Sequence, residues 1–241
     1  MGPLVFEKSG AAAGYGGLML IAEDLLLLAT DDVTGKSTVS SVQLEPALAG
    51  AVLMELVVAG RVTIEGEGRH AMVVITDRTP LGDPVLDAAL QSLIDKAPLK
   101  PGTAIHRLAK GLRDRLNSQL EEHGLLRRES GKVLGVFPTT RWPAQDSGYE
   151  AEVRTHVVGV LRDGLEPDAR AALIITVLTA ADLLTTVVDK GDLKAAKARG
   201  TQIGEGNWAG DSVRKVIQET QEALAAAVMV STTAAIVGGS S

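Results

Sequence analysis

The sequence predicts a mainly α-helical protein, built as a single compact helical domain with peripheral β-hairpins. Hydrophobic residues make up 45% of the chain but aromatic residues only 2%. The core must therefore be built from Leu, Val, Ala and Ile, which suits packed helices better than an aromatic-rich sandwich. After Glu150 nearly every apolar stretch has helical periodicity. No Pro- or Ser-rich linker divides the 241 residues, which favours one domain.

Local patterns of hydrophobicity and turn residues predict the individual elements. In order, these are an apolar segment (18–28), a helix (45–59), a hairpin (61–65 with 72–75), a helix (85–96), a helix carrying Leu108 to Leu120, a second hairpin ending in a strand (133–137), and helices at 150–161, 167–188, 193–200 and 208–236. Pro46 fits the first turn of its helix, and Gly60 fits the end. The Gly-rich residues 1–17 are expected to form a flexible lead before a domain over residues 18–241.

The second helix and hairpin are basic, although the whole chain has a net charge of −6. Within residues 106–137 the cations are Arg107, Lys110, Arg113, Arg115, Arg127, Arg128 and Lys132, and the acids are Asp114, Glu121, Glu122 and Glu129, so 7 minus 4 gives +3. Leu108, Leu112, Leu116 and Leu120 recur every fourth residue, which predicts one amphipathic helix. Gly131 is expected to lie at the hairpin turn.

The strand after that turn is expected to form an apolar tip, made by Val133, Leu134, Val136 and Phe137. A cationic helix followed by an apolar tip is typical of proteins that meet an anionic lipid surface or a nucleic acid. Two simpler interpretations stand beside this one: a solvated helix face, and a strand packed on the core.

Residues typical of catalysis or metal binding are sparse. The absence of cysteine excludes disulfides and thiolate chemistry. The four histidines show no metal-ligand spacing, and the short glycine motifs lack the context of phosphate loops. We therefore expect no enzyme, no cofactor and no metal. The apolar stretches 169–188 and 223–237 are interpreted as buried helices rather than membrane spans.

Two other functions fit parts of the pattern. A helix followed by a basic hairpin also occurs in winged-helix DNA-binding proteins, but a net acidic chain is poorly suited to phosphate neutralisation, so no nucleic acid is expected. A hairpin with an unpaired edge can pair with a second copy, so a homo-oligomeric interaction scaffold without a lipid ligand is the second hypothesis.

Five segments resemble, in order and spacing, the Golgi phosphoprotein 3 family, which includes compact bacterial members. They are LIAEDLLLLATDDVTG (20–35), ELVVAGRV (55–62), PLGDPVLDAAL (80–90), LRDRLNSQLEEHGLL (112–126) and RAALIITVLTAADLL (170–184). The resemblance implies a helical, cytosolic domain, peripheral on membranes, that recognises phosphatidylinositol 4-phosphate through a basic pocket. Eukaryotic members also bind cytoplasmic tails of Golgi glycosyltransferases, which implies membrane-protein tails as possible partners.

The resemblance also implies site residues. Two headgroup-binding arginines of the family fall on Lys110 and Arg113, while its pocket tryptophan and a further arginine fall on Ser40 and Ala49. The segment from Val133 to Phe137 matches a hydrophobic hairpin implicated in self-association and membrane contact. We therefore expect a non-enzymatic adaptor that contacts anionic phospholipid headgroups through Lys110 and Arg113, with Arg107 and Arg115 beside them.

Overall fold

The computed structural model describes residues 19–66, 68–133 and 137–205. The expected lead over residues 1–17, the expected helix at 208–236, and Leu134 and Val136 of the expected tip lie outside these ranges. The described part contains eight α-helices and two antiparallel two-stranded sheets, which confirms the mainly helical fold class.

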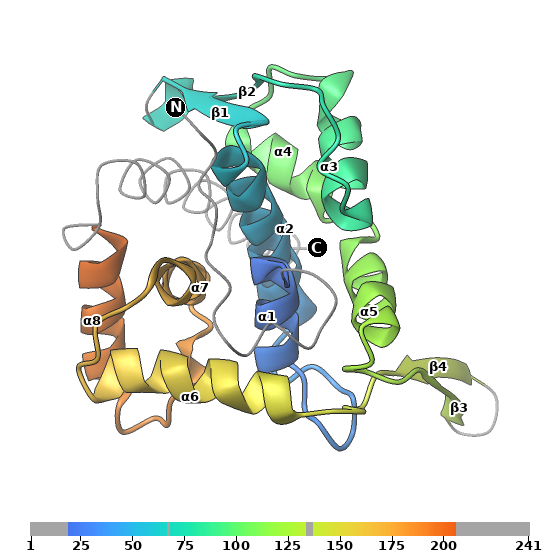
Figure 1. The fold of residues 1–241 in the computed structure, drawn as a ribbon, viewed down its shortest axis with the longest axis vertical. Helices are drawn as coiled ribbons and strands as arrows, with labels where there is room; N and C mark the ends of the chain where they lie inside the picture. Colours follow the sequence, from blue (N-terminus) through green and yellow to red (C-terminus); the bar gives the residue numbers. More distant parts are fainter. Residues whose placement is uncertain (1–18, 67, 134–136, 206–241) are drawn as a thin grey trace, which may run out of the picture.

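The elements follow the chain in a simple order (Figure 1). The helices are α1 (Ile21–Leu28), α2 (Ser41–Val58), α3 (Pro84–Ile94), α4 (Pro101–Leu108), α5 (Leu112–Glu122), α6 (Gly148–Arg162), α7 (Ala169–Ala180) and α8 (Leu193–Gly204). The strands are β1 (Val62–Glu65), β2 (Met72–Ile75), β3 (Glu129–Val133) and β4 (Phe137–Arg141), and two short 3-10 turns are η2 (Gly68–His70) and η3 (Leu184–Thr186).

Helices α1 and α2 lie at the centre of the molecule, with the other helices around them (Figure 1). Every residue of α1 is buried, and it contacts α2, α5, α6 and α7. Its run of leucines explains this position, because a helix that is apolar on all sides is stable only when other helices cover it. Two residues of α1, Glu23 and Asp24, are acidic and yet buried.

Helix α2 begins four residues earlier than expected, so Pro46 lies inside the helix and the prediction of a first-turn proline is wrong. Proline cannot donate a hydrogen bond to the carbonyl of Val42. That carbonyl belongs to an exposed first turn, in which Val42 itself is 65% exposed, so water can reach it. By length and composition α2 is the one described helix that could span a membrane, but 61% of its residues are buried inside the protein, as in the core helix of a folded domain.

The first hairpin forms as predicted, with Val62 opposite Ile75 and Glu65 opposite Met72. Gly60 ends the preceding helix with a positive φ of 68°, a conformation that favours glycine. A helix followed by a hairpin occurs a second time in the chain, because α5 is followed by the antiparallel pair β3 and β4.

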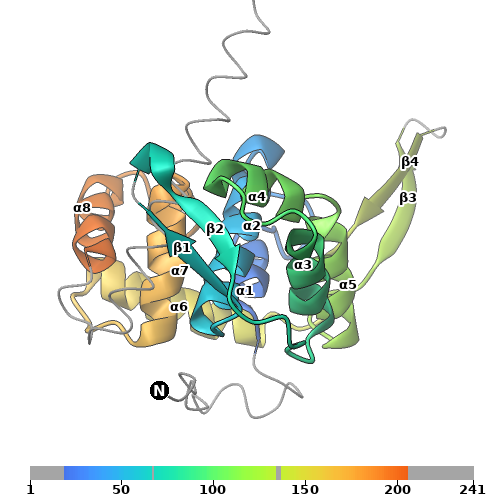
Figure 2. The same ribbon diagram turned by 90° about the horizontal axis from the view of Figure 1, so that it is seen from above.

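The turn of the second hairpin was predicted at the wrong place. Gly131 lies in the middle of β3, opposite Thr139, and the chain reverses between Val133 and Phe137. The segment expected to be one apolar strand is thus divided between the end of β3 and the start of β4. Sequence patterns missed β3 because Glu129–Val133 is mostly polar, as an exposed hairpin strand can be. The hairpin projects from the helical body in both views (Figures 1 and 2).

The base of this hairpin is bound to the turn between α1 and α2. The amide of Ala144 donates to the carbonyl of Asp32 at 2.8 Å, and the amide of Trp142 donates to the carbonyl of Gly35 at 3.3 Å. A Cβ atom on Gly35 would lie only 2.3 Å from the nitrogen of Pro143. The two segments therefore approach so closely that only glycine fits at position 35.

The leucine stripe from Leu108 to Leu120 is buried as expected, but it does not belong to one helix. Helix α4 ends at Leu108, and α5 starts at Leu112. Gly111 between them has a φ of 63°, which breaks the helical path while the leucines continue to face the core. Similarly, the helix expected at 167–188 ends at Ala180, before Asp182 with a φ of 56°.

Candidate functional site

The four predicted cations lie around the connection between α4 and α5, which we call the basic turn and define by Arg107, Lys110, Arg113 and Arg115. Arg107 belongs to the last turn of α4, Lys110 to the connection, and the other two to the first turn of α5. Lys110 is exposed, and the three arginines are half-buried. The structure therefore brings the predicted residues into one short surface segment.

Arg115 contacts the protein backbone. Its Nη2 donates to the carbonyl of Lys110 at 3.1 Å, and a Cβ atom on Gly111 would lie 3.3 Å from its Nη1. The guanidinium thus closes over the left-handed turn at Gly111 and holds Lys110 near the start of α5. This contact differs from the headgroup contact expected of Arg115 from its charge alone.

The surroundings of Lys110 and Arg113 differ from those of Arg115. Neither residue forms an ion pair with any residue that the structure describes. Both lie at the amino-terminal end of α5, where the helix dipole adds a partial positive charge. The segment can consequently attract a phosphate or a carboxylate.

The two positions that replace the family's tryptophan and arginine lie in different environments. Ser40 is exposed at the start of α2, where its hydroxyl donates to Oε1 of Gln43 at 2.9 Å. Ala49 is fully buried within α2, with 0% exposure. Ala49 therefore packs in the core and does not form a pocket wall.

The predicted apolar tip can be followed only in part. Val133 and Phe137 are paired at the outer end of the hairpin by backbone register. At the inner end, the guanidinium of Arg128 lies 5.8 Å from the ring centre of Trp142, within the range of a cation–π interaction. The hairpin thus carries a cation and an aromatic ring at its base.

A second charged site lies in the core, and sequence reasoning missed it. We call it the carboxyl cluster and define it by Glu23, Asp24 and Glu55 with Arg170 and Tyr149. Glu23 and Asp24 are 0% and 1% exposed. Arg170 forms an ion pair with Asp24, and the Tyr149 hydroxyl donates to Oδ1 of the same carboxylate at 2.8 Å. One cation from α7 and one hydroxyl from α6 thereby compensate Asp24.

The remaining two carboxyl groups bind the start of α1. The amide of Leu20 donates to Oε2 of Glu23 at 2.9 Å, and the amide of Ile21 donates to Oε1 of Glu55 at 2.8 Å. These amides have no partner within the helix, so the carboxyl groups satisfy them. Burial raises the pKa of both Glu23 and Glu55 to about 8, and raises the pKa of Asp24 to about 6 against the opposing effect of Arg170.

The sequence contains a signal for this cluster. Glu23 and Asp24 interrupt an otherwise apolar segment, LMLIAEDLLLL, and Arg170 starts another one. Charged residues are almost never fully buried unless they are paired. Acids within a helix too apolar for the surface therefore require a distant cation, but the sequence alone does not say which one.

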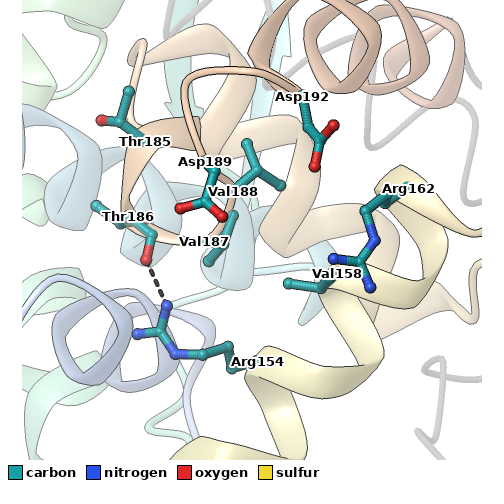
Figure 3. Close-up of a pocket in the computed structure, with 9 residues that line it drawn as sticks. All are labelled: Arg154, Val158, Arg162, Thr185, Thr186, Val187, Val188, Asp189 and Asp192. Atoms are coloured by element: carbon teal, nitrogen blue, oxygen red, sulfur yellow. Dashed lines mark hydrogen bonds between the residues drawn. The ribbon is translucent and has the colours of Figure 1, made fainter.

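A small cavity lies between α6 and the segment that precedes α8 (Figure 3). It has a volume of about 170 Å³, and Arg154, Arg162, Asp189 and Asp192 supply its charges. Arg154 binds Glu150 and the carbonyl of Thr186, and Arg162 binds Asp163 at 2.9 Å. Because both arginines have protein partners, the cavity is a weaker anion site than the basic turn.

The histidines do not gather into a metal site. His123 Nδ1 lies 3.4 Å from Oε1 of Glu23, and His156 Nε2 lies 3.2 Å from Oδ2 of Asp168. Over residues 19–66, 68–133 and 137–205 no group of three or more His, Asp or Glu side chains could hold a metal ion.

Comparison with known proteins identifies one family. The family model described as Golgi phosphoprotein 3 (GPP34) matches residues 21–220 of the chain. This range includes both the basic turn and the carboxyl cluster. No single curated protein matches the chain at a significant level.

Proposed function

Since the chain belongs to the Golgi phosphoprotein 3 family, we propose that it is a peripheral membrane adaptor that binds anionic phospholipid headgroups through the basic turn. The family consists of non-enzymatic adaptors that associate with membranes from the cytosol. Membership therefore confirms the expectation that the chain is not an enzyme. The proposal also includes a cytoplasmic location at the membrane surface and a place among the compact bacterial members of the family.

One observation carries the lipid proposal. Lys110 and Arg113 lie together at the start of α5 without ion-pair partners among the described residues. Each Lys or Arg held near an anionic membrane surface contributes about 1 kcal/mol of binding free energy. The pair therefore contributes about 2 kcal/mol, or roughly a thirtyfold change in affinity.

The headgroup is proposed to be phosphoinositide-like, but with little selection among anionic lipids. Phosphatidylinositol 4-phosphate is the ligand that family membership suggests. Ser40 and the buried Ala49 supply neither an aromatic wall nor a further cation. We expect vesicles containing phosphatidylinositol 4-phosphate and vesicles of equal charge containing phosphatidylserine to bind similarly.

The hairpin and its partners form the second part of the proposal. We propose that Val133 and Phe137, with Leu134 and Val136 between them in sequence, contact the membrane or a second copy of the chain. The cytoplasmic tails of membrane proteins are the proposed cargo. Both suggestions come from the family resemblance, and the projecting backbone of β3 and β4 is compatible with them (Figure 2).

Vesicle sedimentation tests the proposal directly. We expect the wild-type protein to pellet with anionic vesicles and the double variant Lys110→Ala/Arg113→Ala to lose most of that binding. Lys190→Ala/Lys194→Ala is a matched control, because it removes two exposed lysines near α8, on the opposite side of the molecule from α5 (Figure 1). Equal pelleting of all three proteins would contradict the proposal, and stable oligomers without vesicle binding would favour the scaffold hypothesis.

A further inference from the structure

Glu23 and Glu55 differ from Asp24 in how their charge is compensated. Asp24 contacts both Arg170 and Tyr149. Glu23 and Glu55 contact neither a lysine nor an arginine among the described residues. Their hydrogen-bond donors there are the amides of Leu20 and Ile21, and Glu23 also lies 3.4 Å from Nδ1 of His123.

One oxygen of each of these two carboxyl groups is buried without a hydrogen-bond partner. These atoms are Oε1 of Glu23, whose neighbour His123 Nδ1 is 3.4 Å away, and Oε2 of Glu55. An ionised Oε2 of Glu55 would lose its hydration without receiving a donor in exchange, and an ionised Oε1 of Glu23 would have only the 3.4 Å contact with His123. A protonated carboxyl group carries no charge to solvate. The geometry therefore favours the protonated form of both side chains.

The surrounding carboxyl groups act in the same direction, and Arg170 opposes them. Glu23 is close to Asp24 on its own helix, to Glu55 on α2, to Asp83 before α3, to His123 after α5 and to Arg170 on α7. Glu55 is close to Glu23, Asp24 and Arg170. The acids thus outnumber the one arginine, and like charges in a shared buried space favour proton uptake.

We propose that Glu23 and Glu55 form a proton-binding site at the start of α1, through which pH controls how firmly this helix is held against α2 and α5. Protonated, both groups still accept hydrogen bonds from the first amides of α1. Ionised, they repel one another and Asp24 across the α1–α2 contact. His123, 3.4 Å from Glu23, extends the site to the end of α5.

The sign of the effect follows from the two states of the chain. In the unfolded chain a glutamate binds its proton only below about pH 4.3, whereas burial raises the pKa of Glu23 and Glu55 to about 8 in the folded protein. Between these limits the folded state holds more protons. Its stability is therefore greatest at the acidic end of this range and falls as pH rises toward 8. Each group changes the unfolding equilibrium constant by up to about tenfold per pH unit.

Urea unfolding between about pH 5 and about pH 9 tests this inference. We expect the unfolding constant of the wild-type protein to rise steeply with pH, and the variants Glu23→Gln and Glu55→Gln to have flatter profiles. Glutamine resembles a protonated carboxyl group, because it keeps one acceptor and carries no charge. Each variant is therefore expected to lose up to about a factor of ten per pH unit in the slope.

Two control variants and one spectroscopic measurement make the outcome decisive. Glu45→Gln on α2, the helix of Glu55, and Glu122→Gln on α5, which contacts α1, change exposed glutamates and should leave the slope unchanged. Parallel profiles for all variants, even with lower stability, would overturn the proposal. Infrared titration of the wild-type protein detects protonated carboxyl groups without any substitution, so their absence at neutral pH would overturn it as well.

Discussion

The basic turn and the carboxyl cluster are two charged sites in the described part of the chain, and they are built in opposite ways. Lys110 is exposed and has no ion-pair partner among the described residues, whereas Asp24 is buried and receives both a guanidinium and a hydroxyl donor. In the proposed function, Lys110 and Arg113 of the turn bind groups outside the protein. In the cluster, only Asp24 is compensated by residues from α6 and α7.

This difference separates charges that are proposed to serve binding from charges that serve the fold. An exposed cation keeps its hydration and adds little to stability. A buried carboxylate loses its hydration, so every partner around it becomes necessary. Changes in the two regions should therefore have nearly separate effects on unfolding and on vesicle binding.

The largest expected effect comes from removing the cation of the cluster. Arg170→Met leaves Asp24 buried without its arginine partner, and we expect a loss of about 3–5 kcal/mol in the free energy of unfolding, measured by urea denaturation. The double variant Asp24→Asn/Arg170→Met removes both charges and should recover much of the loss. A change below about 1 kcal/mol for Arg170→Met would show that the cluster is less buried in solution.

A smaller effect is expected from Tyr149→Phe. The variant removes the hydroxyl that donates to Asp24 at 2.8 Å, and a hydrogen bond to a charged group contributes about 1.5–3 kcal/mol. The same change should raise the pKa of Asp24 further, because the hydroxyl stabilises its ionised form. Chemical-shift titration of Asp24 can detect that shift, and an unchanged pKa would contradict the hydrogen bond.

The two glycines that flank α5 test whether the shape of the basic turn matters. Gly111 and Gly124 have φ values of 63° and 77°, so alanine at either position should cost about 1–2 kcal/mol through backbone strain. Only at position 111 would the new Cβ atom reach Arg115. We expect similar losses of stability, but weaker vesicle binding for Gly111→Ala alone.

The smallest effect on stability is expected from the double variant Lys110→Ala/Arg113→Ala, within about 0.5 kcal/mol of the wild type. Its vesicle binding should nevertheless fall by roughly thirtyfold, because two cations leave the surface. Denaturation and sedimentation of one preparation measure both quantities. A large loss of stability would show that these cations help to stabilise the fold. The two regions would then not have separate effects on unfolding and on vesicle binding.

The sequence predicted most helices because their apolar faces repeat regularly, and Leu108 to Leu120 are buried as that pattern requires. It did not predict the break at Gly111, because a left-handed residue changes the path of the backbone while the stripe remains continuous. The polar strand β3 was missed for a similar reason: the pairing of Gly131 with Thr139 depends on a distant segment.

The candidate site was predictable to a different extent in each region. The cations of the basic turn are close together in sequence, so their charge is visible without a structure. The carboxyl cluster joins Asp24 to Tyr149 and Arg170, which lie more than a hundred residues away along the chain. Only the packing of α1 against α6 and α7 places these side chains together, and no local pattern encodes it.

The close approach at Gly35 has a mechanical consequence. The hairpin of β3 and β4 projects from the helical body (Figure 2). Its base is hydrogen-bonded to the turn between α1 and α2 through the amides of Trp142 and Ala144. Since no side chain separates Gly35 from Pro143, a pull on the outer end of the hairpin is transmitted directly to that turn. A load applied at the periphery would therefore reach the two central helices first.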